Sequence, residues 1–273
     1  MFGPLLLFFL LAPYILLLSF GLGWSIVSGF WISLTGGAHF GDAYQALMAD
    51  PVFWRTLLRT LGVSGLISLT CLLIAYPTAE FISRSSPTWQ PILLAFVVVP
   101  LWSSAIARTY GWVGIFIRGG AIDRVAGLFG EGPRQLLYTQ LAVYVGMVHV
   151  MLPFCLLPVY VAVSRYDRRL SLASLSLGAG QLRTLLMIKL PVLGPSLIAS
   201  MVAVFILSLG FYTTPAILGQ PSSQFISNLI AQQVFERFDL PRGEAMGAIL
   251  IAAVVVALSA VGIGGRVLGR VRR

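Results

Sequence analysis

Six long apolar stretches, separated by more polar linkers, dominate the hydrophobic pattern of the chain. A membrane-spanning helix needs about 20 predominantly apolar residues, and each stretch reaches that length. The stretches cover roughly residues 4–29, 57–83, 91–117, 137–163, 192–218 and 245–268. The pattern predicts an all-α, polytopic membrane helical bundle with six transmembrane helices, in a single transmembrane domain over residues 1–273. The first stretch has no basic segment before it and no small-x-small cleavage site, so we expect it to be retained as a span.

Prolines interrupt several of the predicted spans. Proline removes a backbone donor, so we expect kinks at these positions. In a membrane such breaks are tolerated only against protein or a water-filled cavity, which favours a transporter-like bundle over an inert anchor. The prolines concerned are Pro77, Pro100, Pro153, Pro158 and Pro215.

Composition agrees with a membrane location. Hydrophobic residues make up 58% of the chain and charged residues 10%, and the mean hydropathy is +0.92. A soluble domain carries about 25% charged residues, so a secreted disulfide scaffold, a disordered protein and an ordinary cytoplasmic enzyme are excluded. Cys71 and Cys155 both lie within apolar stretches. We interpret them as two small core residues, with no disulfide or metal implied.

The formal net charge of +9 orients the chain, because cytoplasmic loops carry an excess of Lys and Arg. With both termini in the cytoplasm, the external segments hold seven basic and seven acidic residues. The cytoplasmic segments then hold two acids, Glu80 and Asp167, and ten basic residues. These ten are Arg84, Arg165, Arg168, Arg169, Arg183, Lys189, Arg266, Arg270, Arg272 and Arg273. We therefore expect both termini in the cytoplasm, and the basic charge needs no nucleic acid to explain it.

The chain carries no motif of its own for an energy source. The phosphate-binding pattern G-x-x-x-x-G-K-[ST] is absent from the sequence. No Asp or Glu lies deep within a predicted span, since Glu80 and Glu244 fall at predicted helix ends. This argues against a proton- or sodium-coupled carrier. We expect no catalytic residue, metal ion or cofactor in this chain, and energy supplied by a partner.

The predicted cytoplasmic linker over residues 164–191 has the most informative pattern. Its leucines would lie on short amphipathic helices, broken at residues 178–180, where glycine permits a left-handed turn. Pro191 suits the first turn of the next span. A short apolar helix outside the membrane usually marks a docking site for another protein. The leucines are Leu170, Leu172, Leu175, Leu177 and Leu182.

This spacing resembles the EAA loop of ABC-importer permease subunits, in which Glu-Ala-Ala is followed by Gly and later by Ile-x-Leu-Pro. The resemblance implies that the loop forms the coupling helix that sits in a groove of an ATPase subunit. Leu172 stands where Glu is usual, and Ser174 replaces an Ala. A docking contact normally made by a carboxylate is therefore missing or moved. The loop positions assigned to ATPase coupling are Leu172, Ala173, Ser174, Gly178, Ala179, Leu190 and Pro191.

The resemblance continues over nearly the whole chain after Arg55. The segments Pro100-Leu-Trp, Arg108-Thr-Tyr, Gly146-Met-Val-His149 and Thr214-Pro-Ala-Ile-Leu-Gly219 are similar to those of the spermidine/putrescine-type permeases, a group within the MetI-like permeases of binding-protein-dependent transport.

Membership in that group would imply a type I ABC importer permease fold in a bacterial inner membrane. Such a chain is a transport subunit and not an enzyme. It works with two ATPase subunits that carry ATP and Mg, a second homologous permease and a periplasmic solute-binding protein. The resemblance points to a polyamine or a related small charged compound. Relatives that carry phosphonate, iron, thiamine or opines keep other solutes open.

A candidate translocation path combines one arginine with aromatic residues. Arg108 is the one charge well inside a predicted span, and such a residue is costly and usually functional. It either lines the path or is held by carbonyl groups at a kink near Pro100. The aromatic residues could attract cations or serve as interface belts and packing. The candidate residues are Trp102, Arg108, Tyr110, Trp112, Tyr144, Phe211 and Tyr212.

A distant alternative is an intramembrane serine protease. Gly62-Val-Ser64-Gly65 forms a G-x-S-G motif in the second predicted span, and His149 lies two spans later. A Ser–His pair of this kind can act as nucleophile and base. Serine is, however, common on the small-residue packing surfaces of membrane helices.

Overall fold

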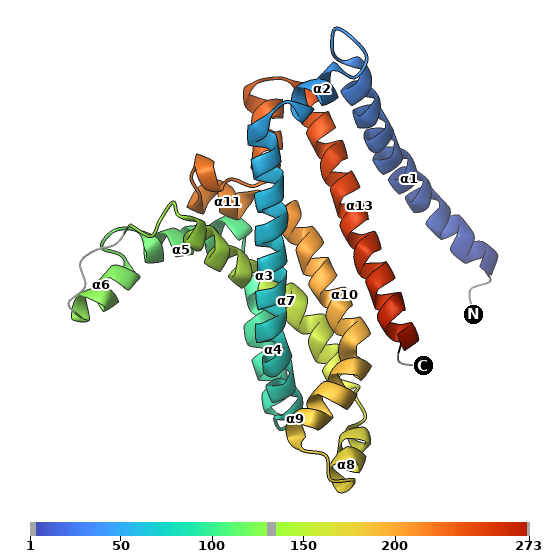
Figure 1. Cartoon of the computed structure of the whole chain (residues 1–273), viewed down its shortest axis with the longest axis vertical. Helices are drawn as coiled ribbons and strands as arrows, with labels where there is room; N and C mark the ends of the chain where they lie inside the picture. Colours follow the sequence, from blue (N-terminus) through green and yellow to red (C-terminus); the bar gives the residue numbers. More distant parts are fainter. Residues whose placement is uncertain (1–3, 130–134, 272–273) are drawn as a thin grey trace. The chain divides into compact units, whose positions relative to one another are not determined.

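The computed structural model describes the backbone of residues 4–129 and 135–271 and the side chains of residues 11–129, 135–220 and 222–259. Within these ranges the chain is built of helices, and no strand occurs there (Figure 1). Some charged residues that support the predicted orientation lie outside the described side chains. These are Glu131, Arg134, Arg266, Arg270, Arg272 and Arg273.

The chain divides into two compact units, where the hydropathy pattern predicts one transmembrane domain. One unit combines Met1–Arg55 with Leu229–Arg273, and the other is Thr56–Asn228. The first unit contains α1 (Pro4–Thr35), α2 (Asp42–Met48), a π-helical turn (Gln232–Glu236) and α13 (Leu240–Val271).

Within the first unit, α1 packs against α13 and α2. Gly29 of α1 faces the Glu244 carboxylate, which leaves no room for a Cβ atom at Gly29. Arg242 Nη2 and Asp50 Oδ2 are 2.5 Å apart. An ion pair and a close glycine contact thus accompany the packing of α1 against α13 and α2 in this unit.

The second unit contains most of α3 and the helices that follow it. In chain order they are α3 (Pro51–Arg84), α4 (Trp89–Val98), a 3-10 turn (Val99–Trp102), α5 (Ala105–Phe116), α6 (Ala121–Leu128), α7 (Gln140–Ser164), α8 (Arg168–Ser176), α9 (Gln181–Thr184), a π-helical turn (Leu185–Lys189), α10 (Leu190–Leu209), α11 (Thr213–Leu218), a 3-10 turn (Pro221–Ser223) and the start of α12 (Ile226–Ala231).

Five helical segments of the described chain are long and apolar enough to cross a membrane. They overlap five of the six predicted stretches and comprise Leu11–Thr35, Pro51–Arg84, Gln140–Ser164, Gln181–Leu209 and Leu240–Ser259. The remaining stretch, residues 91–117, forms two helical segments, Trp89–Trp102 and Ala105–Leu128, bent by 100° relative to each other. They make a sixth span if they are taken together.

Proline has different consequences at different positions. Pro100 lies in the 3-10 turn directly before the bend, where a kink was expected. The helix continues through Pro77 in α3 and through Pro153 and Pro158 in α7. The predicted span 192–218 is interrupted, because α10 ends at Leu209 and the chain resumes helical structure only at α11.

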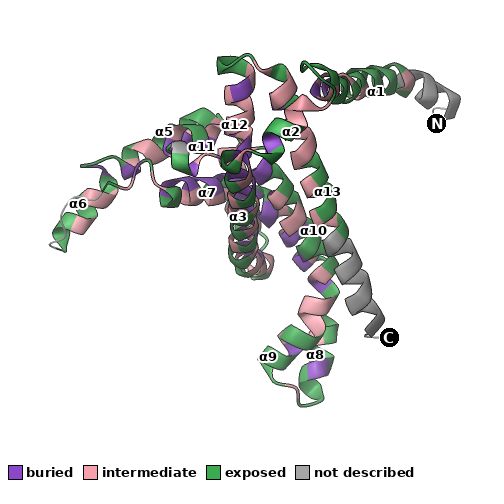
Figure 2. Cartoon of the chain, turned by 45° about the horizontal axis from the view of Figure 1, so that its top comes forward, coloured by how far each residue is buried: buried purple, intermediate pink, exposed green. Residues whose placement is uncertain are grey.

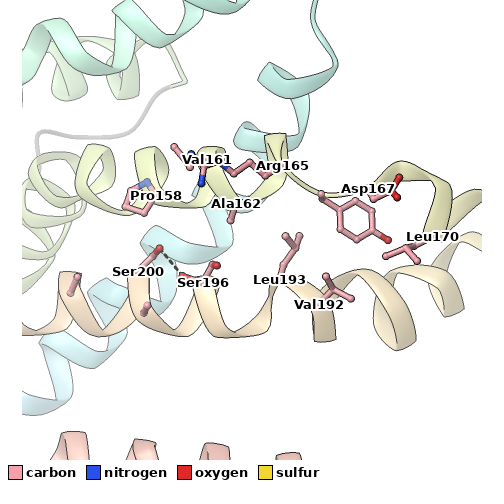
Figure 3. Close-up of a pocket in the computed structure, with 13 residues that line it drawn as sticks. Pro158, Val161, Ala162, Arg165, Asp167, Leu170, Val192, Leu193, Ser196 and Ser200 are labelled. Carbon is pink, nitrogen blue, oxygen red and sulfur yellow. Dashed lines mark hydrogen bonds between the residues drawn. The ribbon is translucent and has the colours of Figure 1, made fainter. Parts of the chain in front are cut away.

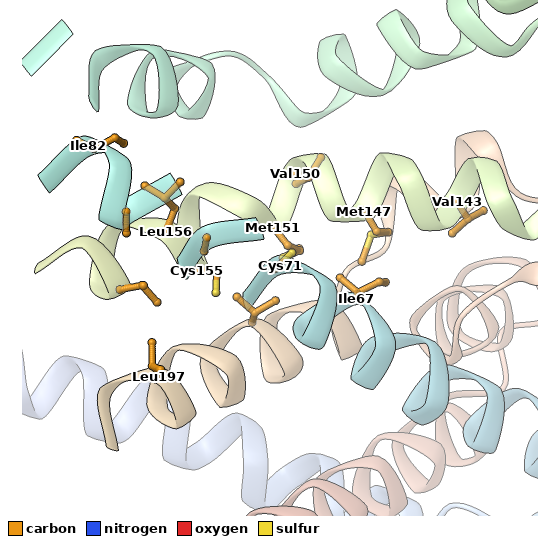
Figure 4. Packing of buried hydrophobic residues seen from close by; sticks show 14 of the residues in the cluster. Ile67, Cys71, Ile82, Val143, Met147, Val150, Met151, Cys155, Leu156 and Leu197 are labelled. Atoms are coloured by element: carbon orange, nitrogen blue, oxygen red, sulfur yellow. The ribbon is translucent and has the colours of Figure 1, made fainter. Parts of the chain in front are cut away.

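The core of the second unit centres on α7 (Figure 4). On α3, Ile67, Cys71, Ala75 and Ala79 recur every fourth residue and are fully buried. This spacing puts them on one helix face, and the small side chains let the helices approach closely, as van der Waals packing in a bilayer requires. Both cysteines are free and buried in this core, with Cys71 Sγ 3.6 Å from the Val148 carbonyl oxygen of α7.

The loops of the second unit gather at two ends. At one end, Arg168 of α8 donates to the Ser83 carbonyl at 2.9 Å. At the other end, the Thr60 hydroxyl accepts from the Ile226 backbone N–H at 3.0 Å. The turn at residues 85–88 and the linker 165–180 belong to the first end, and the break before α11 belongs to the second. This alternation is what a chain that crosses repeatedly requires.

Candidate functional site

The first candidate site is the segment between α7 and α10, residues 165–189, which we call the α8–α9 linker. Local sequence signals define its helices. The Asp167 side chain caps α8 by accepting from the Arg169 backbone N–H at 2.9 Å. At the other end of α8, Gly178 has φ of +84°. The N–H groups of Gly178 and Ala179 bond to the carbonyls of Leu175 and Ser174, a Schellman motif. The glycine thus ends the helix as its position predicts.

A continuous helical segment leads from this turn into the membrane. It runs from Gln181 through the π-helical turn Leu185–Lys189 into α10, where Pro191 occupies the first turn. The sequence places the start of the next span at Pro191, whereas the helix begins ten residues earlier. The π turn rearranges the hydrogen bonds just before the proline, which has no N–H to donate.

Polar contacts join α8 to α9 and to the residues just before α8. The hydroxyls of Ser174 and Thr184 lie 3.0 Å apart and are buried. The Tyr166 and Ser171 hydroxyls lie 2.8 Å apart. Ser174, which departs from the EAA pattern, therefore joins the two arms of the linker.

A charged cluster ties the same linker to the end of α3. Glu80 forms ion pairs with Lys189 and with Arg84, the latter at 2.7 Å. The Lys189 ammonium also lies 5.4 Å from the centre of the Tyr166 ring. This cluster was not predicted from the sequence. A signal was present, because Lys189 is the only lysine of the chain and Glu80 is the only acid predicted at the cytoplasmic end of a span.

The linker exposes several large apolar side chains, and Figure 2 shows α8 and α9 mostly in the colour of exposed residues. Leu172 is 61% exposed and Leu177 89% exposed. Leu182, Leu186 and Met187 are exposed as well. We call this set of four exposed leucines and one methionine the leucine patch, of which Leu177 and Met187 line one groove.

A groove of about 550 Å³ lies between α8 and the helical segment that follows it. The residues that line it are Leu170, Ala173, Ser174, Leu177, Gly178, Ala179, Arg183, Met187 and Ile188. The structure therefore brings together Ala173, Ser174, Gly178 and Ala179 at one groove. Leu190 and Pro191 lie farther along the chain, in the first turn of α10.

A larger pocket of about 740 Å³ opens between the end of α7 and the start of α10 (Figure 3). Pro158, Arg165 and Asp167 line one side, and Leu193 and Ser200 line the other. None of the seven candidate path residues lines this pocket.

Arg108, in the second candidate site, lies beside the bend between the 3-10 turn and α5. Its Nη1 donates to the Pro100 carbonyl oxygen at 2.5 Å, so the side chain spans the bend. Its Nε is buried and has no hydrogen-bond partner. This geometry corresponds to the alternative in which the arginine is held at the kink. Trp102 and Tyr110, on either side of it in sequence, are exposed.

Trp112 and Tyr144 connect three helices of the second unit. Trp112 Nε1 donates to His149 Nδ1 of α7 at 3.2 Å, and its ring stacks on Phe116 at 5.2 Å. The Tyr144 hydroxyl of α7 lies 2.5 Å from the Thr70 hydroxyl of α3. Sequence reasoning missed the Thr70 partner, because only the fold brings it to Tyr144.

Phe211 and Tyr212 lie in the break between α10 and α11. Their carbonyl oxygens accept from the side chains of Ser227 and Asn228 at 2.9 and 3.0 Å. The break therefore has defined partners for its free backbone groups, as a non-helical segment at membrane depth requires.

The serine–histidine arrangement of the protease alternative is not formed. Ser64 is fully buried, and its hydroxyl has no hydrogen-bond partner. His149 Nδ1 is occupied by Trp112. Among the described side chains, no three His, Cys, Asp or Glu residues gather as a metal site would require.

Curated transport proteins are similar to the chain over most of its length, although no family model matches it. The spermidine/putrescine transport system permease protein PotB of Escherichia coli K12 is 30% identical over 206 residues, covering 75% of this chain and 74% of PotB. PotB of Haemophilus influenzae is 29% identical over 255 residues, covering 92% and 87%. The E. coli inner membrane ABC transporter permease protein YdcU is 26% identical, covering 77% and 70%.

Solved structures support the fold. A chain of the bacterial alginate ABC transporter, in complex with an alginate pentasaccharide-bound periplasmic protein, has a TM-score of 0.73 at 18% identity, covering 92% of this chain and 90% of that one. A second structure of an alginate-importing ABC transporter also has a TM-score of 0.73. At this identity the likeness concerns the fold alone. It confirms the all-α, polytopic architecture predicted from the sequence.

Proposed function

This chain belongs to the family of spermidine/putrescine ABC transporter permeases, and from that membership we propose that it carries a polyamine or a related small charged compound inward across a bacterial inner membrane. The predicted resemblance to this family is confirmed by the 30% identity with PotB over 206 residues. As a permease it is a multi-pass transport subunit and not itself an enzyme. ATP and Mg bind to a separate ATPase.

The observation that carries the proposal is the geometry of the α8–α9 linker. Leu172 and Leu177 of its leucine patch are exposed before the apolar segment Gln181–Leu209, and the other three patch residues are exposed in the first turns of that segment. A Schellman motif at Gly178 fixes the turn between the two groups. The same linker continues into α10 as one helical segment and is tied to α3 through Glu80 and Lys189. A force applied to the patch would therefore reach two spans.

We assign the α8–α9 linker to the cytoplasm and both termini to the same side. The end of the second unit that contains this linker carries Arg84 and Lys189 as well as the four arginines of the linker, as the positive-inside rule requires for a cytoplasmic face. The helix α3 crosses the membrane once between Arg84, at this end, and Arg59, near its other end. We therefore place the Arg59 end outside.

The proposed assembly contains two ATPases, a second homologous permease and a periplasmic solute-binding protein. The ATPase would receive Leu172, Ala173, Ser174, Gly178 and Ala179, with Leu190 and Pro191 passing the movement into α10. Closure of the two ATPases would then move the coupling linkers and open the bundle outward, and release would reopen it inward.

The path is proposed to run along the aromatic face of α5, α7 and the α10–α11 break. Trp112, Tyr144 and Phe211 present aromatic rings there, and such rings attract cations. A cationic solute also needs carboxylates, but no Asp or Glu lies deep within a predicted span, and Glu80 is already paired with Lys189 and Arg84. We therefore expect most carboxylates for a cationic solute to come from the second permease and the binding protein.

Uptake by the reconstituted system tests the function. The full chain, its permease partner and the ATPase are placed in proteoliposomes with the binding protein outside, and ATP-dependent uptake of labelled spermidine and putrescine is measured. Stabilisation of the binding protein by polyamines, compared with phosphonate, iron, thiamine and opines, identifies the solute. The proposal is rejected if neither polyamine is taken up and none of these compounds stabilises the binding protein.

A pair of substitutions at Gly178 tests the coupling role. Asn tolerates the left-handed conformation, whereas the β-branched Val does not. We expect Gly178→Val to lower uptake about tenfold or more, because strain of this kind costs about 1–3 kcal/mol, and Gly178→Asn to retain most uptake. Undiminished ATPase binding and uptake in Gly178→Val would remove this turn from the coupling mechanism.

A further inference from the structure

The α8–α9 linker has a strongly one-sided charge. Residues 164–191 contain a single acid, Asp167, against five basic residues. The basic residues are Arg165, Arg168, Arg169, Arg183 and Lys189. Their distribution determines what kind of surface this linker can contact.

Contacts within the chain already engage the acids at this end of the second unit. The Asp167 carboxylate caps α8 through the Arg169 backbone N–H. Glu80 binds both Lys189 and Arg84. On the basic side, Lys189 is bound to Glu80, and Arg168 donates to the Ser83 carbonyl. The acids thus serve internal contacts, and Arg169 and Arg183 are both exposed.

These two arginines lie close to residues of the leucine patch. Arg169 precedes Leu172 by three residues on α8, so their side chains share one helix face. Arg183 lines the 550 Å³ groove together with Leu177 and Met187. A partner that covers the leucine patch must therefore come close to two guanidinium groups.

We propose that the ATPase surface that receives this linker is an apolar groove with carboxylates at its rim, placed opposite Arg169 and Arg183. The inference rests on the proposed function and specifies the chemistry of its partner. A basic rim would repel both arginines, and a neutral rim would offer their guanidinium groups no ion-pair partner. Complementary charge across an interface sets specificity and association rate.

A sign test at Leu172 examines this proposal. Lys and Glu both replace an exposed leucine by a long charged side chain, so the two variants lose similar apolar contact and differ mainly in sign. The full chain is held in lipid nanodiscs, and binding of its separately purified ATPase is measured at 50 and 300 mM salt. With an acidic rim, we expect Leu172→Glu to bind about tenfold more weakly than Leu172→Lys at low salt. The difference should shrink at high salt, where charges are screened.

Arg183 provides a second pair, which remains informative if a Leu172 variant is poorly folded. Arg183→Glu should weaken binding more than Arg183→Gln. Arg237→Glu, an equal charge change at an exposed arginine of the first unit, should leave binding unchanged. Gel filtration and thermal stability of each variant confirm that it is folded.

The outcomes separate two kinds of failure. Tighter binding by Leu172→Glu than by Leu172→Lys, or equal binding by both, overturns the acidic rim. In either case wild-type binding leaves the permease function standing. Absence of ATPase binding by the wild-type chain rejects the proposed function itself, and the acidic rim with it.

Discussion

Glu80, near the end of α3, forms an ion pair with Lys189, the last residue of the π-helical turn before α10, although 109 residues separate them in the chain. The pair joins two spans at the point where the α8–α9 linker enters the second of them. The Lys189 side chain is 12% exposed and the Glu80 side chain 20% exposed. If one side chain of the pair is removed, water can therefore hydrate the remaining charged group only in part.

Glu80→Gln should lower the stability of the folded chain by about 2 kcal/mol, because the acceptor of Lys189 loses its negative charge while the lysine remains charged and partly buried. It should also reduce solute-stimulated ATP hydrolysis while ATPase binding is retained. The measurements are thermal stability in nanodiscs and ATP hydrolysis by the assembled transporter. The swap Glu80→Lys with Lys189→Glu provides the control, since it restores opposite charges. A swapped chain that is no better coupled than Glu80→Gln would show that the pair does not transmit movement.

Ser174→Ala should destabilise the linker by about 1–2 kcal/mol, because the buried Thr184 hydroxyl loses its partner. The double variant with Thr184→Val should recover part of that loss, because both polar groups are then gone. Hydrogen exchange of the backbone over residues 168–190, in single and double variants, measures the effect locally. Faster exchange in the double variant than in Ser174→Ala would contradict the pairing of the two hydroxyls.

The fold was predictable from the sequence where a physical signal is local. Hydropathy locates the long apolar helices. Gly178 marks the end of α8, because the turn there requires a left-handed φ that glycine adopts without strain. The bend of 100° near Pro100 has a local cause in the proline, although its size does not follow from the sequence.

Long-range pairing follows from no local pattern, and only for Glu80 and Lys189 did the sequence carry a hint, in the one lysine of the chain and the one acid at a cytoplasmic span end. Glu80 with Lys189, and Thr70 with Tyr144, meet only once α3 packs against the later helices. The sequence predicts a helix start at Pro191, because proline suits the first turn of a helix. The helix in fact begins at Gln181, and the π turn before Pro191 allows it to continue through the proline. The role of Arg108 was left open by the sequence, since both alternatives predict the same residue at the same place.

Gly146 on α7 tests the close packing of α11. A Cβ atom at Gly146 would lie 2.7 Å from Leu218 Cδ1 and 3.0 Å from Thr214 Cγ2. Gly146→Ala should therefore destabilise the chain by about 1–3 kcal/mol through overpacking. Gly194→Ala in α10 is the matched control, because that site has open space and alanine favours a helix by about 1 kcal/mol over glycine. The order of their melting temperatures in nanodiscs checks the prediction, and equal temperatures would contradict it.

Arg108 separates a structural role from a charge effect. Its guanidinium donates to the Pro100 carbonyl across the bend. If this bond holds the bend, Arg108→Gln, which still carries an amide donor, should retain more uptake than Arg108→Ala. Arg108→Lys keeps the charge and can still donate to one carbonyl oxygen, so it should also retain more uptake than Arg108→Ala. We expect a loss of about tenfold in Arg108→Ala, as the removal of a charged hydrogen bond of about 1.5 kcal/mol implies. Uptake that is retained by Arg108→Lys but is as low in Arg108→Gln as in Arg108→Ala would instead show that transport depends on the charge and not on the hydrogen bond across the bend.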